Sequence, residues 1–287
     1  MIQWKSLQRI KKIPKKDFEK KFLETEIPVV IENIYNDADL TKKWTLHHFK
    51  KEIGDITVPV FDSRIKKDES AYTQPDLYMK FGEFLDDILY NPKPSYRMFL
   101  FNMFREYPKI REDFPVPEYA DGLLKNLGFM FFGGRDTKVR NHFDLDMNHV
   151  FHTHYEGKKI VILCSPENNV PLYKLPFNSY TLVDIDKPDF EKYPALKYVN
   201  GYKTELQTGD TLYIPPGYWH FMHYLEPGYS ISYRKQSKKI INSLKGLNNL
   251  TLNLTIDKLL NLFFKESWVN CKISYSKLMA NKYIVEK

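Results

Sequence analysis

Residues 209–220 read GDTLYIPPGYWH, a short apolar strand between two turn signals. Gly209 and Asp210 predict a tight turn before the strand, and the Pro-Pro-Gly at 215–217 predicts another after it. His220 then begins the next strand. We therefore expect a single hairpin to point His220 into the interior of a β-rich fold.

A second segment supplies partners for His220. His142 and Asp144 stand two residues apart, and residues i and i+2 of a strand point to the same face. Two histidines and one carboxylate are the ligands of the facial triad that holds a non-heme Fe(II) and leaves coordination positions open. The alternative for His142 is a turn histidine that hydrogen-bonds a nearby Asp. The segments together predict His142, Asp144 and His220 as the metal-binding and catalytic residues.

The pattern of hydrophobic residues and turn signals along the chain predicts three zones within one structural unit. Residues 1–127 mix helices with a few strands, residues 128–235 are strand-rich, and residues 236–287 are helical. The pattern predicts strands at 27–31, 56–61, 158–163, 179–184, 211–214 and 229–233, and helices at 41–53, 81–90 and 118–126. Pro59 favours an edge position for its strand. Short, turn-bounded strands are typical of a barrel or double-sheet jelly roll, here mainly β with flanking helices.

The C-terminal zone contains a strongly apolar stretch. Its apolar residues are Leu259, Leu260, Leu262, Phe263 and Phe264. A helix that is apolar on most sides is normally buried. We expect it either to close the end of the barrel or to form a homodimer interface, and we favour the homodimer.

Composition bounds the class of protein. With 287 residues, 43% of them hydrophobic, the chain can bury a substantial core as one domain. Its net charge of +7 indicates a lysine-rich solvated surface, with attraction to an acidic partner such as nucleic acid as the alternative. No recognisable nucleic-acid-binding motif accompanies the charge.

The cysteine content and the hydropathy of the chain indicate the cellular compartment in which we expect the protein. Two cysteines are too few for a disulfide framework, and Cys164 lies in an apolar run that predicts a buried thiol. No segment has the length of a signal peptide's apolar region or of a membrane span. We therefore expect a soluble, cytoplasmic protein without a membrane partner.

The motifs together resemble the JmjC/cupin-like group of Fe(II)- and 2-oxoglutarate-dependent oxygenases, including its asparaginyl-hydroxylase and bacterial cupin-like branches. One motif is His142-Phe143-Asp144-x3-Asn148, and another is Gly157-Lys158-Lys159-x4-Cys164-Ser165-Pro166. The third is the Gly-Asp-x3-Ile-Pro-x3-Trp-His of residues 209–220. The resemblance is clear over residues 128–235 and extends weakly to Pro28-Val29-Val30.

The resemblance implies a double-stranded β-helix in which His142, Asp144 and His220 bind Fe(II). It also implies that Lys159 pairs with the distal carboxylate of the co-substrate 2-oxoglutarate, and that Asn148 lies near its metal-bound end, with O2 as the other co-substrate. A buried lysine needs such an anionic partner. The alternatives are a strand-end lysine that reaches solvent and a turn asparagine.

The chain departs from the family pattern at several positions. A tyrosine and a threonine that often hold the distal carboxylate correspond to Phe99 and Val139 here. The residues that could replace them are Thr137, Tyr155 and Tyr213. Arg234 stands where the asparaginyl hydroxylases have an asparagine.

Additional histidines surround the motifs. His149, His152 and His154 could line the pocket, offer another imidazole to the metal, or be polar strand residues facing a wet cavity, which we favour. His223 follows His220 by three residues and would compete for the metal only if a bulge shifted the strand.

The activity implied by the resemblance is hydroxylation of an unidentified substrate, with a protein side chain favoured, coupled to decarboxylation of 2-oxoglutarate to succinate. One alternative is N-methyl demethylation by the same chemistry, which releases formaldehyde. Another is a non-catalytic, metal-binding cupin-like protein, because the positions of Phe99 and Val139 lack carboxylate partners. Nucleic-acid binding is a further alternative, motivated by the positive charge.

Overall fold

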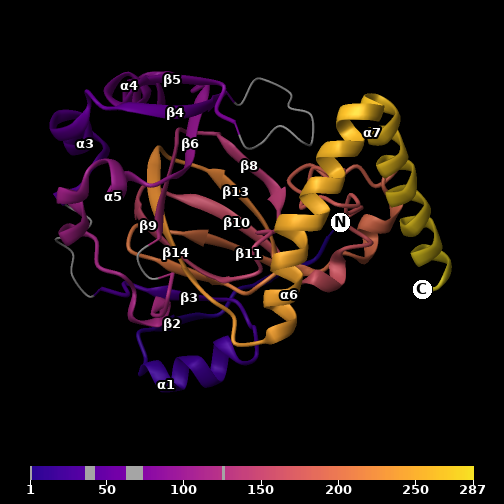
Figure 1. Cartoon of the computed structure of the whole chain (residues 1–287). Coiled ribbons are helices and arrows are strands. Elements are labelled where there is room, and N and C mark those ends of the chain that lie inside the picture. The colour runs from indigo at the N-terminus through magenta and orange to yellow at the C-terminus, as the bar shows by residue number, and fades with distance from the viewer. Residues whose placement is uncertain (1, 36–42, 63–73, 125–126) are drawn as a thin grey trace.

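The structure, a computed structural model, describes residues 2–35, 43–62, 74–124 and 127–287. Two β-sheets form its centre, with α3, α4 and α5 on one side and α6 and α7 on the other (Figure 1). The strands are β1 (Trp4–Ser6), β2 (Arg9–Lys11), β3 (Val29–Glu32), β4 (Thr57–Asp62), β5 (Leu77–Lys80), β6 (Tyr96–Phe101), β7 (Gly128–Gly133), β8 (Lys138–His142), β9 (His149–Glu156), β10 (Lys159–Cys164), β11 (Gly201–Leu206), β12 (Thr211–Ile214), β13 (Trp219–Tyr224) and β14 (Gly228–Lys235). The predicted mainly-β jelly roll with flanking helices is confirmed.

The helices surround these sheets. The α-helices are α1 (Lys15–Phe18), α3 (Leu46–Ile53), α4 (Phe81–Tyr90), α5 (Met103–Glu106), α6 (Ile240–Asn248) and α7 (Leu254–Val285). The π-helical segments are η1 (Glu19–Leu23) and η6 (Asn249–Asn253), and the 3-10 turns are η2 (Pro108–Asp113), η3 (Glu118–Ala120), η4 (Pro166–Asn168) and η5 (Pro194–Tyr198).

From β7 onward the chain crosses repeatedly between the two sheets. One sheet has the order β1-β11-β10-β13-β8, and the other β2-β3-β12-β9-β14-β7-β6-β4-β5. The expected hairpin of β12 and β13 is wrong, because these strands lie in different sheets. Both edges of β12 are already paired, with β3 and β9, so β13 cannot join it and pairs instead with β10 and β8. The turn at residues 215–217 therefore carries the chain from one sheet to the other.

Aromatic packing joins the larger sheet to the N-terminal helices. The Phe49 ring of α3 meets Phe132 of β7 and Tyr229 of β14 edge-on, with centroids 5.6 and 5.1 Å apart. The buried Tyr229 hydroxyl donates to the Trp44 carbonyl at 2.7 Å. Thr45 caps α3 by accepting from the His48 amide, so this helix begins later than the expected 41–53, of which residues 41–42 lie outside the described residues. The helix predicted at 81–90 is confirmed as α4.

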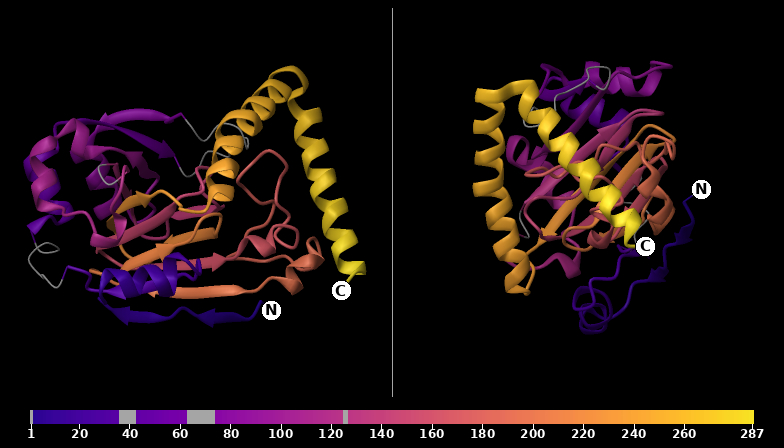
Figure 2. Two further views of the ribbon diagram at one scale, coloured as in Figure 1. Left: turned by 60° about the horizontal axis from the view of Figure 1, so that its bottom comes forward. Right: turned by 90° about the vertical axis from the view of Figure 1, so that its right-hand side faces the viewer.

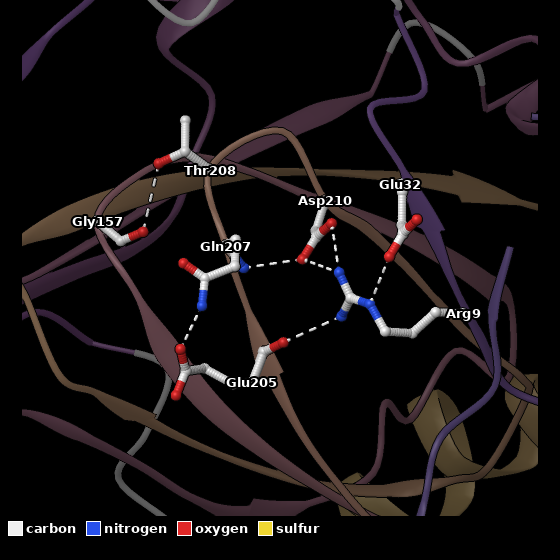
Figure 3. Close-up of polar contacts among 7 residues, drawn as sticks. All are labelled: Arg9, Glu32, Gly157, Glu205, Gln207, Thr208 and Asp210. Carbon is white, nitrogen blue, oxygen red and sulfur yellow. Dashed lines mark hydrogen bonds and ion pairs between the residues drawn. The ribbon is translucent and has the colours of Figure 1, made fainter. Parts of the chain in front are cut away.

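An N-terminal arginine fastens the first strands to the turn before β12. Arg9 on β2 pairs with Glu32 and with Asp210, each at 2.7 Å, and donates to the Glu205 carbonyl (Figure 3). Asp210 also accepts from the Gln207 amide at 2.8 Å. Gly209 adopts φ +95°, as the predicted tight turn requires.

Two predicted elements are wrong. Residues 179–184 form only isolated bridges, at Tyr180 and Thr181, because Asn178 accepts from the Tyr180 amide and turns the chain. The helix expected at 118–126 is reduced to η3, since Gly122 at φ +110° leaves helical geometry, while residues 125–126 lie outside the described residues.

Pro59 predicts that its strand, β4, lies at the edge of a sheet, and this is confirmed for only part of the strand. β4 pairs with β5 over residues 57–60 and with β6 at residues 61–62, so the end strand is β5. Pro59 lies where β4 has only one neighbour, so its missing N–H disrupts no ladder.

The C-terminal helix bends into two arms (Figure 2). The bend lies at Lys265, with φ 43° and ψ −121°. Asp257 on the first arm accepts from Lys272 at 2.7 Å and from the Trp268 indole at 2.8 Å on the second. Lys272 and Asp257 are both buried, so a charged pair holds the arms together. None of the described helices is long and apolar enough to cross a membrane.

The sequence predicts that the apolar C-terminal stretch is buried. Within a single copy of the chain this prediction is wrong. Leu262, Phe263 and Phe264 are 67%, 73% and 58% exposed. The apolar residues exposed on α6, η6 and the first arm are Ile240, Ile241, Leu244, Leu247, Leu250, Leu252, Ile256, Leu259, Leu262, Phe263 and Phe264. An apolar surface of this extent is unusual for a monomer, and the homodimer stays a prediction.

Substituting Phe263→Glu tests that prediction. If a second copy covers this surface, a carboxylate there would be desolvated without a partner, and we expect at least about tenfold weaker self-association. Light scattering after gel filtration over a concentration series measures it. Lys277→Glu, exposed on the second arm, is the control and should leave the mass unchanged. A wild-type chain that stays monomeric at the highest concentration would contradict the prediction.

Candidate metal centre and its cavity

Two neighbouring strands bring the predicted triad together. His142 ends β8 and lies opposite His220 on β13, with ring centroids 4.1 Å apart. Asp144 follows two residues later, and its Oδ1 lies 4.0 Å from His142 Nε2. One ligand atom from each of the three lies within 4.8 Å of the others. Their role as metal ligands stays a prediction.

Alternation along the chain aims these side chains. Phe143, between the two ligands, packs edge-on against the buried Trp219, with ring centroids 4.8 Å apart. The Met147 amide donates to the Asp144 carbonyl and closes a turn there. Asp144 therefore lies just beyond the strand, and the turn and the Phe143 anchor hold it beside His142.

Hydrogen bonds set the tautomer of both histidines. His142 Nδ1 lies 2.8 Å from the Arg140 carbonyl, and His220 Nδ1 lies 3.1 Å from the Tyr218 carbonyl. A carbonyl only accepts, so each Nδ1 carries the proton and each Nε2 lone pair is left for a metal. Burial lowers the pKa of His142 to about 3, with nearby positive charge contributing, so the ring is neutral near pH 7.

Arg234 fixes the carboxylate. Its Nη1 donates to Asp144 Oδ2 at 3.0 Å and to Asp146 Oδ1 at 3.2 Å. Burial alone would raise the pKa of Asp144, but the charge of Arg234 holds it well below its ordinary value. One oxygen of Asp144 is thus held by Arg234, while the other faces His142. The sequence marked Arg234 only as a departure from the family pattern.

A cavity of about 320 Å³ opens beside the triad. It is lined by the triad and, among others, by Arg97, Phe99, Thr137, Val139, Tyr224 and Arg234. Its volume and largely apolar and aromatic wall are those of a small-molecule site.

Lys159 lies behind this wall. Its Nζ lies 2.5 Å from His152 Nε2, donates to Ser230 Oγ at 2.6 Å, and lies 5.0 Å from the Tyr224 ring centroid. Lys159 is fully buried, and burial lowers the pKa of its amine well below the usual value. Tyr224 and Thr137 line the cavity, whereas Lys159, His152 and Ser230 do not. The strand-end lysine that reaches solvent, the alternative considered for Lys159, is wrong.

Of the other two residues predicted to bind the co-substrate, one lines the cavity and one does not. Thr137 lines the cavity, but its hydroxyl donates to the Gly134 carbonyl at 2.7 Å. Asn148 lies outside the lining and donates to Asp146 at 3.0 Å. Their co-substrate roles stay predictions. Of the possible replacements, Tyr155 stacks on Tyr229 in the core and Tyr213 contacts His149, so neither lines the cavity.

The extra histidines are buried in β9 rather than in the cavity wall. His152 and His154 are two residues apart and contact Ser232 and Ser230, at 2.6 and 2.8 Å. His149 contacts Tyr213 Oη at 2.8 Å. The expected wet cavity around them is therefore wrong, and in the described part of the chain the candidate metal group contains none of them.

Sequence reasoning missed Arg97. Arg97 lines the cavity from β6, and the signal was an arginine inside the apolar run YRMFLF at 96–101. Gly133 ends β7 next to this wall. A Cβ there would lie 2.7 Å from Thr137 Oγ1 and 2.8 Å from Tyr224 Cε2, so only glycine leaves room for both.

Comparison with known proteins gives a family match. Residues 15–237 match the family described as Cupin-like domain. The chain is 27% identical to JmjC domain-containing protein D of Dictyostelium discoideum over 259 residues, which cover 79% of this chain and 56% of that protein. It is 25% identical to Lysine-specific demethylase 8 of Xenopus tropicalis over 75% of this chain and 49% of that protein.

A further match covers a smaller part of the chain. The chain is 31% identical to tRNA wybutosine-synthesizing protein 5 of Gallus gallus over 116 residues, which cover 40% of this chain and 36% of that protein. The chain thus spans about half the length, or less, of these relatives.

The buried histidines predict acid sensitivity. Burial lowers the pKa of His149 to about 4, against about 6.5 in the unfolded chain. The unfolded state therefore takes up the proton first, and stability falls as the pH drops from 6.5 to 4. We expect His149→Gln to remove up to about 3 kcal/mol of this loss, measured by urea unfolding across that range. The exposed His47→Gln is the control, and an unchanged pH profile in His149→Gln would contradict the prediction.

Proposed function

Because the chain belongs to the family of cupin-like domains and has JmjC-type relatives, we propose that it is an Fe(II)- and 2-oxoglutarate-dependent oxygenase. The observation that carries the proposal is the convergence of His142, Asp144 and His220 on one cavity. Neither the fold nor the family would support a reaction without such a site.

The donor set fits iron. Two imidazoles and one carboxylate match the facial triad of non-heme Fe(II) oxygenases. Both Nε2 lone pairs are left for a metal, and the charge of Arg234 keeps Asp144 ionised. His142, Asp144 and His220 would hold the ion.

Bound iron, with 2-oxoglutarate and O2, would supply the oxidising chemistry that hydroxylates a carbon while 2-oxoglutarate becomes succinate and CO2. The protein's part is positioning. The carbonyls of Arg140 and Tyr218 orient the two rings, and Arg234 holds Asp144. The apolar wall, which includes Phe99 and Val139, limits water around the reacting groups.

The same chemistry supports two candidate reactions, hydroxylation and N-methyl demethylation. We favour hydroxylation of a protein or peptide side chain. The similarity to Lysine-specific demethylase 8 over 75% of the chain supports N-methyl demethylation as the second candidate. The shorter similarity to tRNA wybutosine-synthesizing protein 5 supports testing RNA as a substrate.

The first test is metal-dependent turnover. We expect the wild-type protein with Fe(II) to convert 2-oxoglutarate to succinate, and His142→Ala and Asp144→Ala to fall to the level of iron-free protein, because each removes a ligand. Succinate is measured by mass spectrometry, and iron content of each variant by metal analysis.

His223→Ala is the matched control. His223 is three residues from His220 on the same strand, but its Nε2 pairs with Asp136 at 3.2 Å, away from the triad. Turnover should survive in this variant. Unchanged turnover in His142→Ala would refute the site assignment, and iron binding without any succinate would favour a non-catalytic metal-binding protein.

The products separate the two candidate reactions. A hydroxylated peptide gains one oxygen and releases no aldehyde, whereas an N-methylated peptide loses its methyl group as formaldehyde. Peptide libraries with and without methylated lysine, read by mass and by formaldehyde assay, distinguish them. Loss of methyl mass with matching formaldehyde would replace hydroxylation as the preferred reaction.

A further inference from the structure

The helix that follows the last strand has polar and small residues on its inner face. Asn242 and Gly246 of α6 and Asn249, where α6 continues into η6, follow one another at intervals of four and three residues, which is one face of a helix. Asn242 and Gly246 are buried and Asn249 is half-buried, so this face lies against the protein. The exposed face carries apolar side chains such as Leu244 and Leu247. α6 is therefore held through amides and a glycine backbone rather than through apolar packing.

Asn242 anchors the start of this inner face. Its Nδ2 donates to Glu26 Oε1 at 2.8 Å and to Ser237 Oγ at 3.0 Å. Lys239 pairs with the other oxygen of Glu26 at 2.9 Å. A buried amide that donates twice fixes the direction in which α6 leaves β14, so the rest of the inner face reaches a defined place.

Gly246 packs directly on the turn that carries Asp144. A Cβ on Gly246 would lie 2.5 Å from the Asp146 carbonyl oxygen and 3.0 Å from the carbonyl carbon, both of them backbone atoms. Alanine is ordinarily the better residue inside a helix. The close approach of the helix backbone to the turn therefore explains the glycine at this position.

Asn249 holds the neighbouring carbonyl of the same turn. Its Nδ2 donates to the Leu145 carbonyl at 3.1 Å. Its Oδ1 accepts from Asn253 Nδ2 at 3.0 Å, which orients the amide with its N–H groups toward the turn. The next residue, Leu250, lines the cavity. η6 is π-helical, and π-helical segments within helices are frequent at functional sites.

The turn has a backbone conformation that needs support from outside. Met147 adopts φ 54°, a left-handed conformation that residues other than glycine take up only at a cost in energy. The Met147 amide closes the turn by donating to the Asp144 carbonyl at 3.2 Å. β8 ends at His142, so the position of Asp144 depends on the contacts that the turn makes.

We propose that Gly246 and Asn249 are positioning residues of the metal centre, which hold the turn of Asp144 in the geometry that binds a divalent metal ion. The inference rests on the metal site of the proposed function. Both residues act through the backbone of the turn, and neither supplies a ligand atom to the triad. The contribution comes from outside the matched family region, which ends at residue 237, whereas α6 begins at Ile240.

The test measures metal affinity rather than turnover. Metal-free full-length protein is titrated with Co(II), which lies next to Fe(II) in the affinity order of divalent metals. Calorimetry gives the dissociation constant, and the visible ligand-field bands report the geometry around the ion. Asn249→Leu keeps nearly the same size but cannot donate to the Leu145 carbonyl. We expect it to weaken Co(II) binding about tenfold, the lower end of what losing an outer contact of a metal site costs, and to shift the bands.

Gly246→Ala is an independent variant. Alanine favours helix formation, so a change that acted only through helix propensity would leave Co(II) binding intact. The added Cβ does not fit beside the Asp146 carbonyl, so we expect the turn to shift and Co(II) binding to weaken about tenfold here too.

Matched controls change exposed neighbours on the same helix. Asn248→Leu and Ser243→Ala make the same kinds of substitution at exposed positions of α6, and both should bind Co(II) as the wild type does. Urea unfolding of each metal-free variant shows that it is folded before its affinity is compared. If Asn249→Leu does not fold, Asn253→Leu, which removes the hydrogen bond that orients Asn249, takes its place.

The outcomes separate this inference from the proposed function. Wild-type Co(II) affinity in folded Asn249→Leu and Gly246→Ala would overturn the inference and leave the oxygenase proposal standing. An equal loss in Asn248→Leu would also overturn it, since any change to the helix would then act on the site. Equal Co(II) binding by His142→Ala and the wild type would overturn the metal site and this inference together. Co(II) binding at the triad without any succinate from the Fe(II) protein would remove the oxygenase function alone.

Discussion

The antiparallel pairing of β8 with β13 is the constraint on which the candidate site depends. It sets His142 opposite His220 and brings their rings to 4.1 Å, although 77 residues of chain separate them along the sequence. The backbone carbonyls that accept from each Nδ1 belong to the residues two positions earlier, Arg140 and Tyr218. One pairing thus determines both the separation of the two imidazoles and their tautomers. A slip of one residue would turn either ring to the other face of the sheet.

The strand crossing that precedes β13 makes this pairing possible. Since β12 is paired on both edges in the larger sheet, the chain must leave that sheet at the turn after Ile214 and enter the smaller one. Arg9 secures the other end of β12 by binding the Asp210 carboxylate in the turn before it (Figure 3). The first strands therefore contribute to the placement of a site to which they supply no residue.

Ionisable side chains lie around the cavity in two layers. Asp144, Arg234 and the triad histidines form the layer that faces the cavity, where the charges of Asp144 and Arg234 offset each other. His152, Lys159 and Ser230 form a second layer inside the wall, where burial favours the neutral form of the amine and the imidazole. A buried amine that donates to a neutral imidazole avoids the cost of an isolated charge. Arg97 belongs to the first layer, because it also lines the cavity.

The sequence by itself predicted the jelly roll, the helix at 81–90 and the three triad residues, because strand alternation and turn signals are local properties of the chain. It could not assign β12 and β13 to different sheets, since that depends on which strand edges are already paired. It also could not show that Lys159 lies behind the wall and Arg97 in front of it, because facing direction follows from cross-strand register. The sequence also could not show that the apolar face of the C-terminal helix is exposed. Leu262 and Phe263 are apolar residues in a helical pattern, but only tertiary packing decides whether other residues cover them.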